Sequence, residues 1–156
     1  MGKSSAIRQL GKQFQHFAEI NFERDRAVAA FFKGDLDVRL IASKIATYLQ
    51  VPVSAGNTLL FLDEIQACPE AIMALRFFRE DYPELHVVAA GSLLEFALQE
   101  LPTFGVGRIH SIFMYPMTFD EFLGAMQMDG LLAMRKAADA GHPLDDFRRS
   151  EERFSR

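Results

Sequence analysis

The sequence predicts an α/β domain with a mostly parallel β-sheet, because short apolar strands alternate with helical segments along the chain. Two of these strands, Thr58 to Leu62 and His86 to Ala90, are continuous apolar runs without polar alternation. Such runs are typical of parallel strands that are buried on both faces. The length of 156 residues suits one domain of this kind. Crossovers between its parallel strands are expected to be right-handed.

The elements expected before residue 57 follow from the spacing of the apolar residues. A helix from Lys3 to Phe17 is predicted by apolar residues three and four positions apart, namely Ile7, Leu10, Phe14 and Phe17. Ala18 to Phe22 alternates like a strand, and Arg24 to Phe32 reads as a short helix that ends near Gly34. Asp35 is the predicted N-cap of the next helix. That helix carries Leu36, Leu40, Ile41, Ile45 and Leu49 on one side.

After residue 68 the pattern continues with helices and one further strand. A helix begins at Pro69 and ends near Pro83, and a second helix is expected from residue 93 to residue 101. Arg108 to Tyr115 is rich in β-branched and aromatic residues and is predicted to be a strand. Thr118, with Glu121 three residues later, predicts a capping box at the start of a helix that reaches residue 128. Residues 130–156 read as two further helical stretches that are mostly polar towards the end.

Composition and charge narrow the class of protein. About half of the residues are apolar and a quarter are charged, as in ordinary globular domains. The net charge of −4 argues against a general nucleic-acid binder, which is usually basic. Cys68 is the one cysteine, so an intramolecular disulfide is excluded. No signal peptide and no apolar run of membrane-spanning length is visible, so we expect a cytoplasmic location.

The first candidate site is the tripeptide Gly2-Lys3-Ser4, which stands directly before an amphipathic helix. In a phosphate-binding loop the glycine lets backbone N–H groups approach the phosphates, and the lysine ammonium reaches the β- and γ-phosphates. The serine hydroxyl binds Mg²⁺. The full motif needs a strand and an earlier glycine before Gly2, and neither is present. The alternative interpretation of this tripeptide is an N-terminal tail that leads into a helix.

The second candidate site is Asp63-Glu64, which follows the apolar strand Thr58 to Leu62. Two adjacent carboxylates at the end of a buried strand are costly unless they are used. Open α/β sheets bind ligands at this edge. Asp63 is suited to hold Mg²⁺ and Glu64 to polarise an attacking water. The alternative is a polar loop after the strand.

The third candidate is Ser92, which follows the strand His86 to Ala90. Its hydroxyl could hydrogen-bond the attacking water or the γ-phosphate, or it could simply cap the helix that begins at residue 93. The three candidates come in the order that nucleotide chemistry needs, at the ends of successive β–α units. Together they predict a nucleotide site more strongly than any of them does alone.

Longer stretches of the chain resemble a known family. The pattern D-E-I-Q, G-S-L-L-E-F and Y-P-M-T-F-D-E-F-L, within residues 58–71, 75–98 and 106–123, is similar to a branch of bacterial and archaeal AAA+ superfamily P-loop ATPases. The resemblance covers Gly2 to about Met128. It implies a three-layer P-loop NTPase core that binds ATP and Mg²⁺. Members of this branch carry a second, C-terminal domain that is often likened to restriction endonucleases.

The resemblance also implies roles for single residues. Gly2, Lys3 and Ser4 match the end of the Walker A loop, where Ser4 would bind the metal. Asp63 matches the Walker B aspartate, a metal-binding position, and Glu64 matches the catalytic glutamate. Ser92 matches the sensor position. Arg108 stands where such ATPases place an arginine that faces the γ-phosphate of a neighbouring subunit, although it could equally be a surface residue at a strand start.

The resemblance implies a domain that is truncated at both ends. The resemblance leaves three parts of the family's pattern without a match in residues 1–156: the first strand, the front half of the phosphate loop and the second domain. We therefore expect a truncated ATPase domain over residues 1–128 and a helical, mostly polar tail over residues 129–156. Two functions remain open. One is an ATPase that drives a conformational change in a partner, with a homo-oligomer or another protein as that partner. The other is a non-catalytic remnant that acts as a protein-interaction module.

Overall fold

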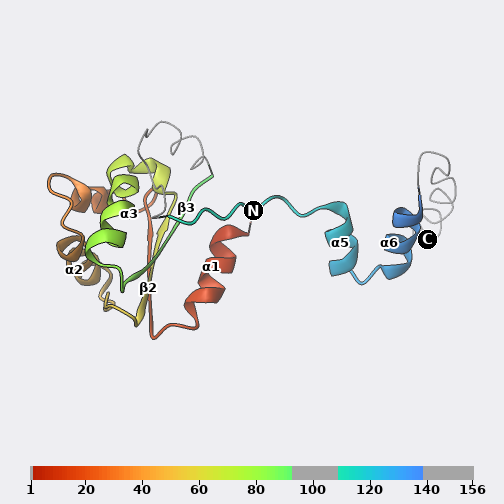
Figure 1. The fold of residues 1–156 in the computed structure, drawn as a ribbon, viewed down its shortest axis with the longest axis horizontal. Coiled ribbons are helices and arrows are strands. Elements are labelled where there is room, and N and C mark those ends of the chain that lie inside the picture. Colours follow the sequence, from red (N-terminus) through yellow and green to blue (C-terminus); the bar gives the residue numbers. More distant parts are fainter. Residues whose placement is uncertain (1, 93–108, 139–156) are drawn as a thin grey trace. The chain divides into compact units, whose positions relative to one another are not determined.

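The computed structural model describes residues 2–92 and 109–138, and the chain divides into two compact units, Met1–Phe113 and Met114–Arg156. The first unit is an α/β domain and the second contains two short helices (Figure 1). The first unit contains α1 (Lys3–Gly11), β1 (His16–Asn21), the 3-10 helix η1 (Arg26–Phe32), α2 (Val38–Leu49), β2 (Thr58–Asp63), the 3-10 helix η2 (Ile65–Ala67), α3 (Pro69–Asp81) and β3 (His86–Ala90). The second unit contains α5 (Phe119–Ala125) and α6 (Asp129–Ala137).

The three described strands form one parallel sheet in the order β1-β2-β3, which confirms the predicted α/β fold class. The central strand β2 is buried at every position, as its unbroken apolar run indicates. In the register of the sheet, Asn21 lies opposite Asp63, and Asp63 lies opposite Ala90. The carboxyl ends of all three strands therefore meet at one edge of the sheet, which is where open α/β sheets bind ligands.

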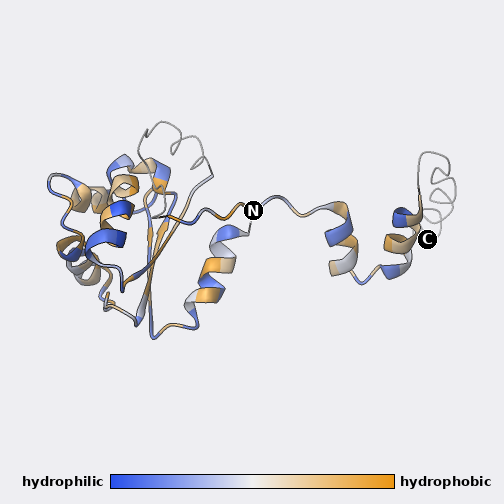
Figure 2. Cartoon of the chain, viewed as in Figure 1, coloured by the Kyte–Doolittle hydropathy of each residue, from blue (hydrophilic) through white to orange (hydrophobic). Residues whose placement is uncertain are grey.

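Helices cover both faces of this sheet (Figure 1). One face presents alternate strand residues such as Ile20, Leu60 and Leu62, which belong to the buried core together with apolar residues of η1, α2 and α3. The opposite face carries Phe17, whose ring stacks on that of Phe61 with centroids 6.3 Å apart. The helix α1 lies on this second face. Figure 2 shows the hydrophobic residues gathered along the strands, and polar residues on the outer sides of the helices.

The helix α2 begins two residues later than the sequence predicts. The side chain of Asp37 accepts hydrogen bonds from the backbone N–H groups of Arg39 and Leu40, at 3.0 and 3.1 Å. The prediction of Asp35 as N-cap is therefore wrong. An N-cap must directly precede the first helical residue for its oxygen to reach the free N–H groups, and Asp37 holds that position before Val38.

The helix α1 is shorter than predicted, because it ends at Gly11 and the chain then turns into β1. Phe17, which the apolar spacing places on the helix, is instead the second residue of the strand. Gly11 is buried, and a Cβ atom at this position would lie 2.4 Å from Cδ2 of the Phe17 ring. Only glycine permits this close approach of helix and strand.

Replacing Gly11 by alanine is expected to destabilise the first unit by about 1–3 kcal/mol, because the new methyl group overlaps the Phe17 ring. Urea denaturation of the two chains measures this change. Gly130→Ala is the matched control, since a Cβ atom there meets nothing within 4 Å. A Gly11→Ala chain as stable as the wild type would contradict this account of how α1 packs.

The predicted strand from Arg108 to Tyr115 is wrong for its described part, because residues 109–115 form neither helix nor strand. Apolar side chains in this segment are largely exposed, with Ile112 at 78% and Tyr115 at 80% of their full area. High β-propensity is insufficient for a strand, because the backbone must also find a hydrogen-bonded neighbour. None of the described residues supplies one to this segment. The helix expected over residues 93–101 and the turn that follows it lie outside the described residues.

The second unit confirms the predicted capping box at the start of α5. The Thr118 hydroxyl accepts from the Glu121 N–H at 3.2 Å, and the Glu121 carboxylate accepts from the Thr118 N–H at 2.7 Å. These hydrogen bonds from the Thr118 backbone and side chain lower the pKa of Glu121. Arg135 of α6 forms an ion pair with Asp120 of α5 at 2.6 Å. The predicted domain boundary at residue 128 stays a prediction.

The capping box makes the helix content of the second unit sensitive to acid. A carboxyl group whose pKa is lowered by folding stabilises the folded form above its ordinary pKa, and this contribution is lost as the pH falls through the lowered value. We expect the helical circular dichroism signal to fall below about pH 4. Glu121→Gln should remove this component, because glutamine closes the same box without titrating. An unchanged acid transition in Glu121→Gln would contradict the assignment.

Among the described residues, no helix combines the length and the apolar character that a membrane span needs.

Candidate nucleotide site

The candidate site is a pocket of about 300 Å³ at the carboxyl edge of the sheet, next to the first residues of α1. Seven described residues line it: Gly2, Lys3, Ser4, Asp63, Glu64, Gly91 and Ser92. Six of them are residues that the sequence singled out, from three separate segments of the chain. Arg108, the one further residue that the sequence predicted for the site, lies outside the described residues. The parallel register explains this convergence, since it places the strand ends side by side.

Gly2 forms the entry to α1 in a conformation that favours glycine. Its φ of 107° lies in the left-handed region, and its carbonyl oxygen accepts the N–H of Ala6 at 2.9 Å. No side chain caps this end of the helix, and no acidic residue stands in its first turn. The first N–H groups of a helix have no partner within the helix and carry its positive partial charge. This end of α1 is therefore suited to an anion.

Lys3 connects α1 to the end of β3. Its Nζ donates a hydrogen bond to the carbonyl oxygen of Gly91 at 2.7 Å. An ammonium group has three donors, so this bond leaves two for a ligand. The sequence marks Gly91-Ser92 as the end of this strand but predicts a role for Ser92 alone, because the contribution of Gly91 is a backbone oxygen that any residue would provide.

Ser4 and Asp63 meet within the pocket. The Ser4 hydroxyl donates to the two carboxylate oxygens of Asp63, at 3.2 and 3.3 Å. Asp63 is only 5% exposed, and a carboxylate that is buried to this extent requires hydrogen-bond donors around it. The site therefore presents a hydroxyl and a carboxylate within one hydrogen bond of each other.

Asn21 is a residue of the site that the sequence reasoning missed. Its Nδ2 donates to Asp63 at 3.2 Å, while its Oδ1 accepts the N–H groups of Glu23 and Arg24 at 3.1 and 3.2 Å. These two backbone donors fix the orientation of the amide, so its N–H group faces the carboxylate. The signal was present, because Asn21 is the last residue of β1. The predicted strand extended to Phe22, which hid Asn21 inside it.

Glu64 follows Asp63 with φ 50° and ψ 44°, in the left-handed region that side chains seldom adopt. This conformation ends β2 and places Glu64 beside Asp63 in the lining of the pocket. The Nε2 of Gln66 donates to the Glu64 carboxylate at 2.6 Å. Gln66 is a second residue that the sequence reasoning did not identify. Strained backbone of this kind clusters at functional sites.

The residues of the pocket fit a magnesium ion that arrives with phosphate. Mg²⁺ prefers oxygen ligands and is commonly held by one or two carboxylates together with substrate phosphates and water. Ser4 and Asp63 provide such oxygens. Over residues 2–92 and 109–138, no group of three or more histidine, cysteine or acidic side chains could hold a metal by itself. A magnesium ion held by Ser4 and Asp63 would take its remaining oxygen ligands from phosphates and water.

Ser92 lies exposed at the rim of the pocket. The helix that it was expected to cap was predicted over residues 93–101, which lie outside the described residues. Ser92 shares the pocket lining with Lys3 and Glu64, and its proposed contact with a ligand stays a prediction.

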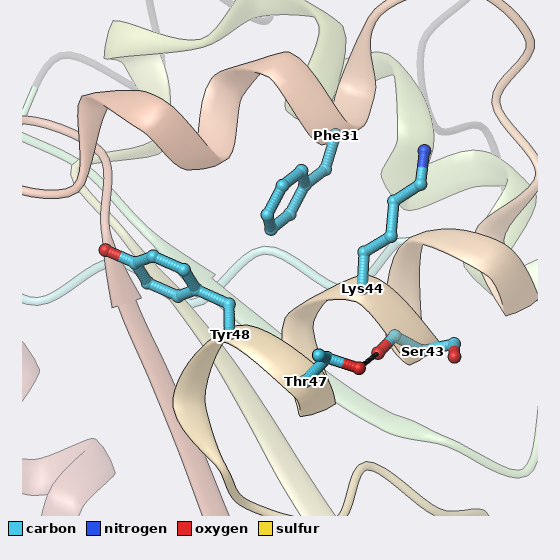
Figure 3. Close-up of a pocket in the computed structure, with 5 residues that line it drawn as sticks. All are labelled: Phe31, Ser43, Lys44, Thr47 and Tyr48. Carbon is cyan, nitrogen blue, oxygen red and sulfur yellow. Dashed lines mark hydrogen bonds between the residues drawn. The ribbon is translucent and has the colours of Figure 1, made fainter.

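A larger hollow of about 400 Å³ lies between η1 and α2 (Figure 3). It is lined by Phe31, Ser43, Lys44, Thr47 and Tyr48, and none of these is a residue that the sequence singled out. No carboxylate belongs to its lining. The rings of Phe31 and Tyr48 contact each other edge to face, with centroids 6.0 Å apart. This hollow lacks the metal-binding groups of the first pocket.

A comparison with protein families agrees with the fold. Residues 1–123 match a family model described as an AAA domain. The chain matches no curated protein and no solved structure. The family match covers the whole described sheet and the pocket at its edge, and AAA domains are nucleotide-binding domains of the ATPase type. The chain therefore belongs to the AAA domain family.

Proposed function

We propose that this chain binds Mg²⁺-ATP in the pocket at the carboxyl edge of its sheet and hydrolyses it. The observation that carries the proposal is the convergence of Lys3 and Ser4 with Asp63, which lies 59 residues after Ser4, accepts a hydrogen bond from its hydroxyl and shares the pocket lining with both residues. These are the groups that phosphate and magnesium require. The family match to residues 1–123 supports the same function.

In this proposal each residue has a separate task. Lys3 and the N-terminal N–H groups of α1 bind the phosphate oxygens. Ser4 and Asp63 hold the metal, which supplies charge neutralisation to the phosphates when bound. Glu64 lies beside Asp63 and accepts a proton from the attacking water. Ser92 orients that water or the terminal phosphate from the end of β3.

Replacing Glu64 by glutamine is expected to leave Mg²⁺-ATP binding nearly unchanged and to lower the hydrolysis rate about 10²- to 10⁴-fold. The amide keeps the size and the hydrogen bonding of the side chain but cannot accept the proton. Phosphate release and calorimetric binding, measured on the same preparation, separate the two effects. Glu84→Gln, at an exposed position before β3, is the control. Hydrolysis at the wild-type rate in Glu64→Gln would refute the assigned role.

The same proposal includes the process that ATP hydrolysis drives. The patterns in residues 58–71, 75–98 and 106–123 support membership of the branch whose relatives carry a domain likened to restriction endonucleases. In that setting hydrolysis drives a conformational change in a partner domain or in a neighbouring copy. Arg108 is then the residue that faces the γ-phosphate bound to the neighbour.

A second candidate function is that of a protein-interaction module without catalysis. The observation that favours it is a set of exposed apolar side chains in the second unit: Met114, Tyr115, Met117, Phe119, Phe122 and Met126. Clustered exposed apolar residues are typical of surfaces that bind a partner. Nucleotide binding distinguishes the candidates, because a module of this kind has no need of the pocket.

A further inference from the structure

Gln66 contacts Glu64, the carboxylate that lines the pocket after Asp63, from the 3-10 helix η2. Its Nε2 donates a hydrogen bond to Oε2 of Glu64 at 2.6 Å. This distance is at the short end for N–H···O hydrogen bonds, as is typical when the acceptor is charged. Gln66 engages Oε2, so the other carboxylate oxygen, Oε1, remains able to accept a proton.

The backbone around Glu64 brings these two side chains together. Side chains two residues apart on a helix point in different directions and do not meet. Glu64 precedes η2 in the left-handed conformation, with φ 50° and ψ 44°, which changes the direction of its side chain relative to Gln66. The turn itself is fixed, because the Ala67 N–H donates to the Glu64 carbonyl oxygen at 3.0 Å and Ile65 is fully buried in the core. The contact is therefore set by a backbone conformation of high energy.

The oxygen of the Gln66 amide indicates that this side chain does not serve the fold alone. Its Oε1 is buried and has no hydrogen-bond partner among the described residues. A buried acceptor without a donor destabilises the folded chain, and such an atom in a native structure needs an explanation. An apolar side chain of the same length would leave no acceptor unpaired. The amide is therefore better explained by what its N–H group does for Glu64 than by stability.

We propose that Gln66 is a positioning residue for ATP hydrolysis, which holds the Glu64 carboxylate in the orientation that receives the proton of the attacking water. The inference rests on the proposed function, since it concerns the same site. In the step that it supports, the water oxygen bonds to the terminal phosphorus, and the water proton passes to Oε1 of Glu64. The bond from this phosphorus to the bridging oxygen breaks, and its electron pair leaves with ADP. Gln66 acts on this step only through Glu64.

The test is the variant Gln66→Met, whose side chain keeps the length and shape of glutamine but has no N–H group. We expect kcat for ATP hydrolysis to fall about 10- to 100-fold, with the dissociation constant of Mg²⁺-ATP unchanged within about twofold. A residue that only supports the fold of the pocket would change binding as well. Gln15→Met, at an exposed glutamine directly before β1, is the matched control. Urea denaturation establishes that the variants fold, and Gln66→Ala gives the same readout if Gln66→Met does not.

A double-mutant cycle with Glu64→Gln tests whether Gln66 acts through Glu64. The Glu64→Gln chain has no carboxylate to position, so adding Gln66→Met should change its remaining rate by less than about twofold. Residues that act independently would instead lower the rate by the product of their separate factors. Single-turnover hydrolysis of labelled ATP measures the low residual rates.

The outcomes separate this inference from the function on which it rests. If the unmodified chain hydrolyses ATP and Gln66→Met does so at the same rate, the inference is wrong and the proposed function stands. The inference is also wrong if Gln66→Met lowers the rate by the same factor with and without the Glu64 carboxylate, or weakens Mg²⁺-ATP binding as much as it lowers kcat. If the folded, unmodified chain hydrolyses no ATP, the proposed function fails and the inference fails with it.

Discussion

Lys3→Ala is expected to weaken Mg²⁺-ATP binding about 10- to 100-fold, because the lysine provides the one ammonium group among the described residues that line the pocket. In the structure this group already spans from α1 to the Gly91 carbonyl at 2.7 Å, which holds it at the pocket. The two remaining N–H donors of the Lys3 ammonium group can then bind phosphate oxygens. Calorimetric titration with Mg²⁺-ATP measures the loss.

The control for this substitution is Lys12→Ala. Lys12 is an exposed lysine at the C-terminal end of the same helix, so its loss changes the net charge equally without touching the pocket. Circular dichroism establishes that both variants fold. Equal affinities in Lys3→Ala and Lys12→Ala would show that general charge attraction, and not the position of Lys3, determines binding.

Asp63→Asn is expected to abolish most of the dependence of ATP binding on magnesium. The amide keeps an oxygen that can accept from Asn21, so the fold should tolerate it, but the charge that binds the metal is lost. Affinity for Mg²⁺-ATP should fall about 10- to 100-fold. Affinity for ATP without metal should rise instead, because a carboxylate that repels the phosphates has been removed.

These opposite signs make the test specific to the assigned role. Titrations of wild type and Asp63→Asn with ATP, with magnesium and with a chelator, give the four affinities that are needed. Asp81→Asn, at the exposed end of α3, controls for the change in net charge. A loss of affinity of the same size with and without magnesium would mean that Asp63 supports the fold of the pocket and does not bind the metal.

The sheet and most of the pocket were predictable from the sequence, because their signals are local and strong. Residues 59–62 and 87–90 are unbroken apolar runs, and this pattern fits a parallel strand. β2 is buried at every position, whereas β3 is fully buried only at Ala90, so the prediction of burial is confirmed for β2 and wrong for most of β3. Asp63 and Ser92 directly follow these runs. Parallel register then brings them together without any further information, since carboxyl ends of parallel strands share one edge.

The predictions were wrong where the local sequence pattern favours one structure and the tertiary packing favours another. The apolar spacing from Ile7 to Phe17 continues through the end of α1, and only the packing of Gly11 against the Phe17 ring shows where the helix must end. Residues 109–115 have strong β-propensity but no described neighbour to pair with. Asn21 was missed because the predicted strand extended to Phe22, one residue too far. Gln66 was missed because its role depends on a hydrogen bond to Glu64 that no sequence pattern signals.

The central claim is that the pocket binds Mg²⁺-ATP. Isothermal titration calorimetry of the unmodified chain measures this binding directly. We predict saturable binding of one Mg²⁺-ATP per chain, which disappears when magnesium is chelated. A chain that is folded by circular dichroism and gives no binding heat and no thermal stabilisation with millimolar Mg²⁺-ATP would contradict the central claim.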